Sequence, residues 1–248
     1  MGILIMGGVE LLPRPSTKLE EIAEQWNGNV ESRALELDDA ADYSYFQVII
    51  PNIRHRLNKY VPIGSSVIDS GCGLGHLTNQ IASWGYKVGG IDIAGEAINH
   101  AARNFKNISF ETTSIIDFAQ FHPGGFDACV LNMVLHNLGD VNENLEAVHR
   151  LLKPNGKVIA SIPHPKTWFT KHFRNKPFEY DIPDSFLLPF KINGGHEHPS
   201  RFTYFHRPVE YYMEHLNSRH FKVLSSKRPI RSDGTPEQDL LFCVWQKI

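Results

Sequence analysis

The amino-acid sequence predicts an α/β fold built on a doubly wound, parallel sheet. Short apolar runs alternate with helical patterns from Ser65 to Ile162. These runs are almost continuously apolar, as expected of strands covered by helices on both faces. The first run ends in a glycine-rich turn, which is typical of a strand-to-helix connection that approaches a ligand.

Two helices are expected before the alternating region. The first 16 residues contain Gly and Pro and predict a loose leader. Residues 19–26 are amphipathic, and residues 45–60 carry apolar side chains at helical spacing. Pro51 is expected to kink or restart the second helix, because proline has no amide hydrogen to donate. We therefore expect residues 1–60 to form a leader and a helical lid.

The alternating region predicts one core over residues 61–163. Strands are expected at residues 66–69, 87–93, 108–111, 126–131 and 157–162. Helices are expected at residues 76–85, 96–105 and 142–152. Gly85 and Gly156 follow the first and third helices, where glycine is a common terminator.

The alternation breaks after Pro163. Of the 45 residues from 164 to 208, ten are aromatic, against 11% in the whole chain. Aliphatic residues are too few there for a separate core, so we expect an irregular, aromatic-rich cap folded onto the sheet. A helix at residues 209–216 and two strands at 221–227 and 239–245 are expected to complete the core over 209–248.

Composition and charge argue against several classes of protein. The chain has 248 residues and a net charge of −2, whereas binding nucleic acid or an anionic membrane requires an excess of cations. No apolar run approaches the roughly 18 residues of a membrane span. The opening residues 1–6 are apolar but short and have no basic start, so we expect a cytoplasmic protein.

Metal and disulfide sites are not expected. The three cysteines are Cys72, Cys129 and Cys243, an odd number at wide spacing without a C-x-x-C pair. His196 and His198 supply only two possible ligands, and no acidic cluster completes a metal site around them.

The glycine-rich turn reads Asp69-Ser70-Gly71-Cys72-Gly73-Leu74-Gly75. A dinucleotide fingerprint would place its third glycine where this chain has His76. An acid at Asp69 would repel a pyrophosphate but would help to hold a cation. Asp92, at the tip of the next strand, can accept hydrogen bonds from both hydroxyls of a ribose. The two acids and the turn therefore predict a positively charged nucleoside ligand.

Four stretches in unbroken order resemble the motifs of class I S-adenosylmethionine-dependent methyltransferases. They are residues 67–75, 89–93, 126–136 and 150–156. The chain resembles the small-molecule branch of this family, near the ubiquinone-biosynthesis-like, type 11 methyltransferases. The resemblance implies a Rossmann-like, mostly parallel seven-stranded sheet with an antiparallel edge strand.

The resemblance also implies which residues bind S-adenosylmethionine and its product, S-adenosylhomocysteine. Gly71, Cys72 and Gly73 would pass under the methionine part of the cofactor. Asp69 would lie near the amino group of that part, and Asp92 would hold the ribose hydroxyls.

Five further residues are implied as cofactor contacts. Ile93 would pack on the adenine. Ser114 stands beside Ile115 at a position where the family often has an acid. The usual contact to the adenine amino group is therefore expected to be weakened or replaced. Asn132 and Met133 would lie beside the methionine moiety and the sulfonium.

Three histidines are candidates for a general base. Methyl transfer from a sulfonium is an in-line displacement, so the enzyme mainly supplies position, alignment and exclusion of water. A base helps when the acceptor is an ammonium or a hydroxyl group, and histidine is the commonest choice. His136, His164 and His206 follow or precede core elements, and one or two of them are expected to face the acceptor.

The aromatic cap favours a small, aromatic or hydrophobic acceptor that is methylated on oxygen or nitrogen. Trp168 and Tyr204 are expected to line the pocket from the cap. Trp26, Tyr43 and Tyr45 are expected to form the opposite wall.

Other functions stay open. Residues 131–134 differ from the Asn/Asp-Pro-Pro-aromatic run associated with methylation of nucleic-acid bases, so a nucleic-acid partner is not expected. The same pocket could belong to a sensor or assembly partner that binds the cofactor without catalysis. A nicotinamide-dependent oxidoreductase is disfavoured by His76. A monomer and a homodimer are both compatible with the sequence.

Overall fold

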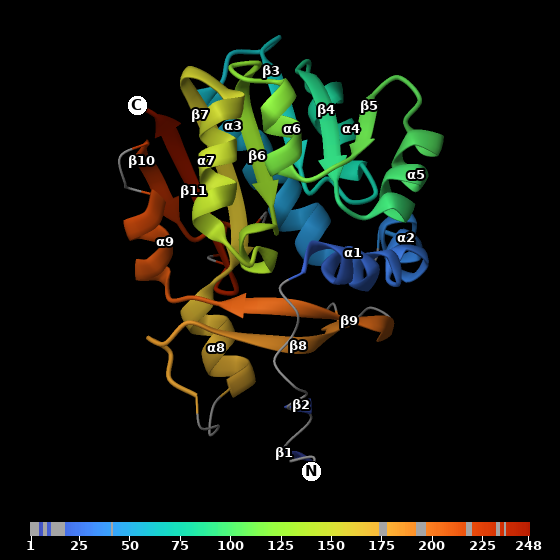
Figure 1. The fold of residues 1–248 in the computed structure, drawn as a ribbon, viewed down its shortest axis with the longest axis vertical. Helices are drawn as coiled ribbons and strands as arrows, with labels where there is room; N and C mark the ends of the chain where they lie inside the picture. The colour runs from blue at the N-terminus through green and yellow to red at the C-terminus, as the bar shows by residue number, and fades with distance from the viewer. Residues whose placement is uncertain are drawn as a thin grey trace.

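The structure is a computed structural model. It describes residues 5–6, 9–10, 18–40, 42–173, 178–191, 197–216, 220–231, 234–235 and 237–248. At its centre is a seven-stranded sheet in the order β10-β11-β7-β6-β3-β4-β5 (Figure 1). Its strands are β3 (Ser66–Ser70), β4 (Lys87–Asp92), β5 (Ser109–Thr112), β6 (Phe126–Asn132), β7 (Leu152–Pro163), β10 (Phe221–Lys227) and β11 (Leu240–Lys247).

The sheet confirms the expected doubly wound, mostly parallel architecture. Strands β3 to β7 pair in parallel, and β11 runs antiparallel to both of its neighbours, β7 and β10. The antiparallel strand was expected at the edge, but it lies one position inside it. The reason is that β10 pairs with β11 as a hairpin and takes the outer position itself.

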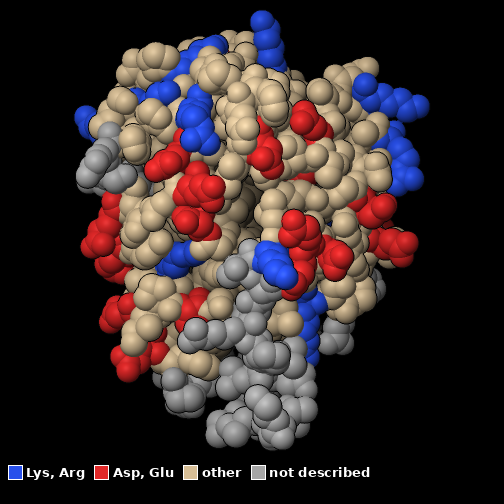
Figure 2. All heavy atoms as spheres, in the orientation of Figure 1, with Lys and Arg blue, Asp and Glu red and all other residues tan. Residues whose placement is uncertain are grey.

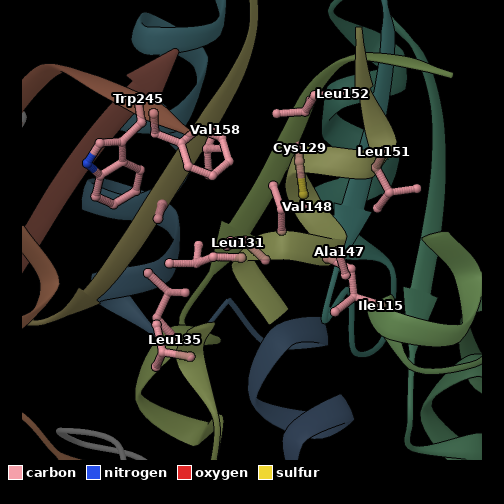
Figure 3. Packing of buried hydrophobic residues seen from close by; sticks show 14 of the residues in the cluster. Ile115, Cys129, Leu131, Leu135, Ala147, Val148, Leu151, Leu152, Val158 and Trp245 are labelled. Atoms are coloured by element: carbon pink, nitrogen blue, oxygen red, sulfur yellow. The ribbon is translucent and has the colours of Figure 1, made fainter. Parts of the chain in front are cut away.

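Helices cover both faces of the sheet. Those that pack on it are α3 (Ile50–Tyr60), α4 (His76–Ser83), α5 (Gly95–Asn104), α6 (Ile115–Phe121), α7 (Val141–Leu151) and α9 (Val209–Leu216). The buried cluster on one face joins Leu131 of β6, Val148 of α7 and Trp245 of β11 (Figure 3). A second cluster joins Ile53 and Ile81 to the opposite face. Burial on both faces explains why the strands read as continuous apolar runs.

Four helical segments precede the sheet or interrupt it. The N-terminal ones are α1 (Leu19–Asn27), α2 (Val30–Asp38) and η1 (Ser44–Ile49), and η2 (Leu135–Asn137) follows β6. The helix expected at residues 45–60 is divided into a π-helical η1 and α3. Pro51 lies in the first turn of α3, where a missing amide hydrogen costs little. Among the described residues, none of the helices has the length and apolar character that crossing a membrane requires.

The aromatic-rich cap expected at residues 164–208 is present, and it is more regular than expected. Residues 164–208 contain α8 (Pro165–Phe173) and an antiparallel hairpin of β8 (Asp184–Lys191) and β9 (Glu197–His206). Phe169, Phe173 and Tyr204 belong to a buried cluster within this segment. Aromatic side chains each bury a large area, so a few of them replace the aliphatic residues that the segment lacks.

The hairpin and the N-terminal helices lie at one end of the sheet. In Figure 1, β8, β9, α1 and α2 lie below the carboxyl ends of the parallel strands. A separate pair of two-residue strands, β1 (Ile5–Met6) and β2 (Val9–Glu10), is antiparallel. The carboxyl end of the sheet is thus covered from two directions.

Candidate functional site

A cavity of about 1100 Å³ lies at the carboxyl ends of β3, β4 and β6. Its walls come from these strand ends, from α1 and α2, and from the hairpin. Doubly wound sheets bind their ligands at this end, where successive strands diverge. Figure 2 shows a hollow in this face of the molecule, with acidic side chains on both sides of it.

The glycine turn after β3 forms the floor of the cavity. Gly71, Gly73 and Gly75 all have positive φ angles, of 76°, 51° and 79°. A Cβ atom on Gly71 would lie 2.3 Å from Cγ2 of Val134, so this position accepts no side chain. A Cβ on Gly73 would meet nothing within 4 Å. The turn therefore presents bare backbone to open space, as a closely bound ligand requires.

Asp92 at the end of β4 is held by two backbone donors. Its Oδ2 accepts a hydrogen bond from the N–H of Gly73 at 2.8 Å, and its Oδ1 accepts one from Ala94 at 2.9 Å. Burial raises the pKa of this carboxyl above its usual value. Each oxygen keeps a further lone pair, so Asp92 can accept hydrogen bonds from two ligand hydroxyls.

Asp69 at the end of β3 is almost fully buried and only half satisfied. Its Oδ2 accepts a hydrogen bond from the hydroxyl of Thr78 at 2.7 Å, whereas Oδ1 has no partner among the described residues. Burial, with a smaller contribution from nearby Asp92, raises the pKa of Asp69 to about 7. A buried carboxyl with an unused acceptor beside a cavity suits a cationic group.

Ser114 and Asp117 cap α6 at the next wall of the cavity. The Ser114 hydroxyl accepts a hydrogen bond from the N–H of Asp117 at 3.1 Å and donates one to its carboxylate at 2.6 Å. Ile93 and Ile115 line the cavity beside them. Because the hydroxyl of Ser114 already serves the cap, little of its hydrogen-bonding capacity is left for a ligand.

The end of β6 is fixed by Ser161, a residue that sequence reasoning missed. The Ser161 hydroxyl donates to Oδ1 of Asn132 at 2.6 Å. The backbone N–H of Met133 donates to the carbonyl of Ser161 at 2.9 Å, which holds Met133 at a φ of 59°. A non-glycine residue in this region is uncommon and needs such support. Ser161 is paired with Asn132 across β6 and β7, and only the sheet register brings them together.

One of the three candidate histidines lines the cavity. His136 lies in η2 and is 5% exposed, and its ring centroid is 5.7 Å from that of Tyr204. Burial, together with the positive charge of Arg207, lowers the pKa of His136 to about 3. The side chain is therefore a neutral imidazole near pH 7, able to accept a hydrogen bond but only weakly basic.

The other two histidines are placed behind the walls. His206 does not line the cavity. Its Nε2 lies 2.8 Å from the carbonyl oxygen of Tyr180, and its ring packs on Phe169. His164 is buried immediately before α8. Burial lowers the pKa of both imidazoles. Neither is among the residues that line the cavity.

All five aromatic residues expected at the acceptor line the cavity. The rings of Trp168 and Tyr204 are 4.2 Å apart at an interplanar angle of 32°. Trp26 lies on the other side, against Phe202. Tyr43 and Tyr45 flank the glycine turn, the first half-exposed and the second buried. Burial and the charge of Asp69 raise the pKa of Tyr45.

The described part of the chain contains no group of three residues that could hold a metal ion. His198 is instead engaged at both ring nitrogens. Nδ1 lies 2.7 Å from the Ser32 hydroxyl, and Nε2 lies 3.0 Å from the Glu36 carboxylate. His196 lies outside the described residues.

Comparison with known proteins points in one direction. Residues 63–207 match a family model described as a methyltransferase domain. The chain is 30% identical over 149 residues to a ubiquinone biosynthesis O-methyltransferase of Thiobacillus denitrificans, covering 58% of this chain and 60% of that protein. It is 26% identical over 235 residues to one of Albidiferax ferrireducens, covering 90% and 86%. The chain spans about half the length of most of the curated relatives it matches.

Solved structures share the fold. A SAM-dependent methyltransferase of Methanosarcina mazei aligns with a TM-score of 0.60 at 22% identity, covering 78% of this chain and 97% of that one. The 1,6-didemethyltoxoflavin-N1-methyltransferase of Burkholderia thailandensis, solved with 1,6-didemethyltoxoflavin and S-adenosylhomocysteine, aligns with a TM-score of 0.63 at 18% identity. That alignment covers 96% of this chain and 94% of the other.

Proposed function

Because the chain belongs to the class I S-adenosylmethionine-dependent methyltransferase domains, we propose that it methylates an oxygen or nitrogen of a small, aromatic or hydrophobic acceptor. One observation carries the proposal. A single cavity joins the bare glycine turn and the two acids Asp69 and Asp92 to the aromatic walls of the lid and the cap. A cofactor site and an acceptor site are thus adjacent.

The residues present fit S-adenosylmethionine. The unpartnered Oδ1 of Asp69 and the open space over Gly73 are the two features that such a ligand would use. Asp92 would hold the ribose hydroxyls, and Asp69 would face the amino group of the methionine part. When bound, S-adenosylmethionine supplies a methyl group on a sulfonium that is already activated for displacement.

The adenine and sulfonium contacts follow the strand ends. Ile93 and Ile115 would pack against the adenine, with Ser114 at its edge. Asn132 and Met133 would lie beside the methionine part, where the Ser161 contact holds the Asn132 carbonyl away and leaves its amide N–H groups as donors. Gly71 and Cys72 would pass beneath the ligand.

The lid and the cap position the acceptor and exclude water. In-line displacement requires the acceptor atom on the far side of the methyl group, and enclosure holds it there. Trp26, Tyr43 and Tyr45 would supply one wall, and Trp168 and Tyr204 the other.

Of the three histidines, His136 is the one that we propose to contact the acceptor, by accepting a hydrogen bond from its reacting hydroxyl or amine group. It lines the cavity, and its neutral imidazole has a buried Nδ1 without a partner among the described residues. His164 and His206, also considered as bases, would support the walls of the cap instead. The relatives do not choose the acceptor atom: one is named an O-methyltransferase and another an N1-methyltransferase.

Calorimetric titration with S-adenosylhomocysteine, with NADH in parallel, tests the cofactor assignment. We expect micromolar or tighter binding of the first and none of the second. Turnover of S-adenosylmethionine with a panel of phenols, amines and heteroaromatics tests the catalytic part. Binding without product from any of them would favour a cofactor-binding sensor or assembly partner. Binding of NADH alone would contradict the proposal.

A further inference from the structure

We propose that the acceptor pocket takes a planar ring that bears no anionic group, and that its fixed charges reject carboxylates and phosphates. The inference rests on the proposed function, because it concerns the acceptor half of the same cavity. The inference restricts the charge of the acceptor. Neither membership of the family nor the aromatic walls determine that charge.

Three cationic side chains line the described part of the cavity, and each already faces a carboxylate. Arg33, Lys171 and Arg231 are these three. Arg33 lies 2.8 Å from the Asp42 carboxylate and 3.0 Å from that of Glu36. An anionic ligand near Arg33 would meet two negative groups beside the one positive group.

The other two cations, Arg231 and Lys171, each face a carboxylate of their own. Arg231 holds the buried carboxylate of Glu237 with two nitrogens, at 2.8 and 2.7 Å. Both nitrogens contact the same oxygen, Oε2, and breaking this charge-assisted pair would leave Glu237 buried and uncompensated. Lys171 lies 3.7 Å from Asp239 in a more exposed pair. Recruiting either cation to an anion would therefore require displacing a carboxylate.

Carboxylates without a cation partner face the same space. Asp140 and Glu143, at the start of α7, line the cavity and form no ion pair with a described residue. Asp140 accepts hydrogen bonds from the backbone N–H groups of Asn142 and Glu143 at 2.9 and 3.1 Å. A helix N-terminus would otherwise attract an anion, but here a carboxylate of the protein occupies it.

The neutral groups in the pocket support the same preference. Trp168 and Tyr204 bring aromatic rings to the wall of the cavity, and the face of an aromatic ring attracts cations and repels anions. His136 adds no positive charge, because its imidazole is neutral near pH 7. Among the described residues that line the cavity, an acceptor carboxylate would meet no cation that does not already face a carboxylate, whereas a planar ring with a hydroxyl or an amine needs no such cation.

The test compares three naphthalene probes of similar shape that differ in one substituent: 2-naphthylmethylamine, 2-naphthalenemethanol and 2-naphthoate. Their affinities are measured by calorimetry on the full chain saturated with S-adenosylhomocysteine, at low salt and at 0.3 M salt. We expect the amine and the alcohol to bind at least about tenfold more tightly than the carboxylate. Added salt should reduce the difference in affinity between the amine and the carboxylate, since screening weakens the interactions of exposed charges.

Two variants separate charge from shape. In Glu143→Gln the amine should lose roughly threefold in affinity, while Glu146→Gln, an exposed carboxylate on the same helix outside the cavity lining, should change nothing. Asp239→Asn should release Lys171 and improve binding of the carboxylate. Equal or tighter binding of 2-naphthoate by the unmodified protein, or binding of none of the three, would overturn the inference. Failure of S-adenosylhomocysteine itself to bind would instead overturn the proposed function.

Discussion

The carboxylate of Asp92 accepts a 2.8 Å hydrogen bond from the backbone N–H of Gly73. This bond joins the end of β4 to the glycine turn after β3, so it connects the two halves of the proposed cofactor site. The sequence places these residues far apart along the chain, and their separate motifs imply no contact between them. Asp92 therefore braces the turn, in addition to its proposed role as an acceptor for ribose hydroxyls.

Replacement of Asp92 should weaken cofactor binding more than it weakens folding. We expect Asp92→Ala to lower the affinity for S-adenosylhomocysteine at least about tenfold, because hydrogen bonds to a charged group are each worth about 1.5–3 kcal/mol. Calorimetry measures the affinity, and circular dichroism checks the fold. The matched control is Glu111→Gln, which removes an exposed carboxylate from β5, the strand that pairs with β4. Unchanged affinity in Asp92→Ala would refute the assignment of this pocket.

Cofactor affinity should depend on pH through Asp69. The amino group of the ligand's methionine part stays cationic between pH 6 and pH 8, whereas Asp69, with a pKa of about 7, loses its proton in this range. Affinity for S-adenosylhomocysteine should therefore rise by roughly tenfold from pH 6 to pH 8. A tenfold change corresponds to a shift of one unit in the pKa of Asp69 when the cationic ligand binds. Titrations at several pH values measure this slope, and Asp69→Asn should abolish it. An affinity independent of pH in the unmodified protein would contradict the prediction.

The same carboxyl should lower the stability of the ligand-free protein as the pH rises. Its pKa is about 7 when folded against a reference of 3.8. Between these values the unfolded chain releases the proton and the folded chain keeps it, so the unfolded state binds fewer protons and the free energy of unfolding falls with pH. Thermal melts from pH 4 to pH 8 measure the slope. Asp69→Asn should flatten it, and an equal slope in that variant would assign the effect to other groups.

His136 should affect the chemical step and not the cofactor. We expect His136→Ala to reduce kcat by about tenfold, the loss of one hydrogen bond that orients the acceptor, with little change in affinity for S-adenosylhomocysteine. His206→Asn is the control, because that side chain contacts the carbonyl of Tyr180 outside the cavity lining. It should lower the melting temperature and leave kcat within a few-fold. A reversed pattern would identify His206 as the functional residue.

Closure of the cavity should depend on buried polar contacts between the lid and the hairpin. Glu36 of α2 and His198 of β9 have fully buried side chains 3.0 Å apart. Glu36→Gln should lower the free energy of local opening of α2 and β9 by about 1–3 kcal/mol. Hydrogen exchange in peptides from these elements measures the change.

The exposed Glu31→Gln on the same helix is the control for the lid. It should leave the exchange of α2 and β9 unaltered. Faster exchange throughout the sheet in Glu36→Gln would indicate a general loss of stability and would contradict a local role.

The core of the fold was predictable from short-range patterns, and so were the glycine turn and the acids that line the cavity. Apolar runs identify β3 and β6, since each is buried on both faces. The glycine turn and Asp92 were recognisable because a tight turn and an acid at a strand end each have a local signature. The capping pattern at Ser114 and Asp117 was equally local, yet α6 was not expected, because it is only seven residues long.

The lid and the cap show where this reasoning fails. Helix α2 was missed because the side chains that it directs to the hairpin include Ser32 and Glu36, which are polar and give no apolar stripe. Their partner, His198, lies more than 160 residues away in the sequence. The segment of the hairpin was read as irregular because its core is aromatic and includes side chains from the separate helix α8.

The sequence by itself determined the doubly wound sheet, the glycine turn and the acids at the strand ends, because each depends on neighbours within a few residues. The tertiary structure decided which of three histidines reaches the cavity, how Ser161 orients Asn132, and which carboxylate each cation faces. Those outcomes depend on strand register and on the packing of distant elements, and no local pattern contains that information.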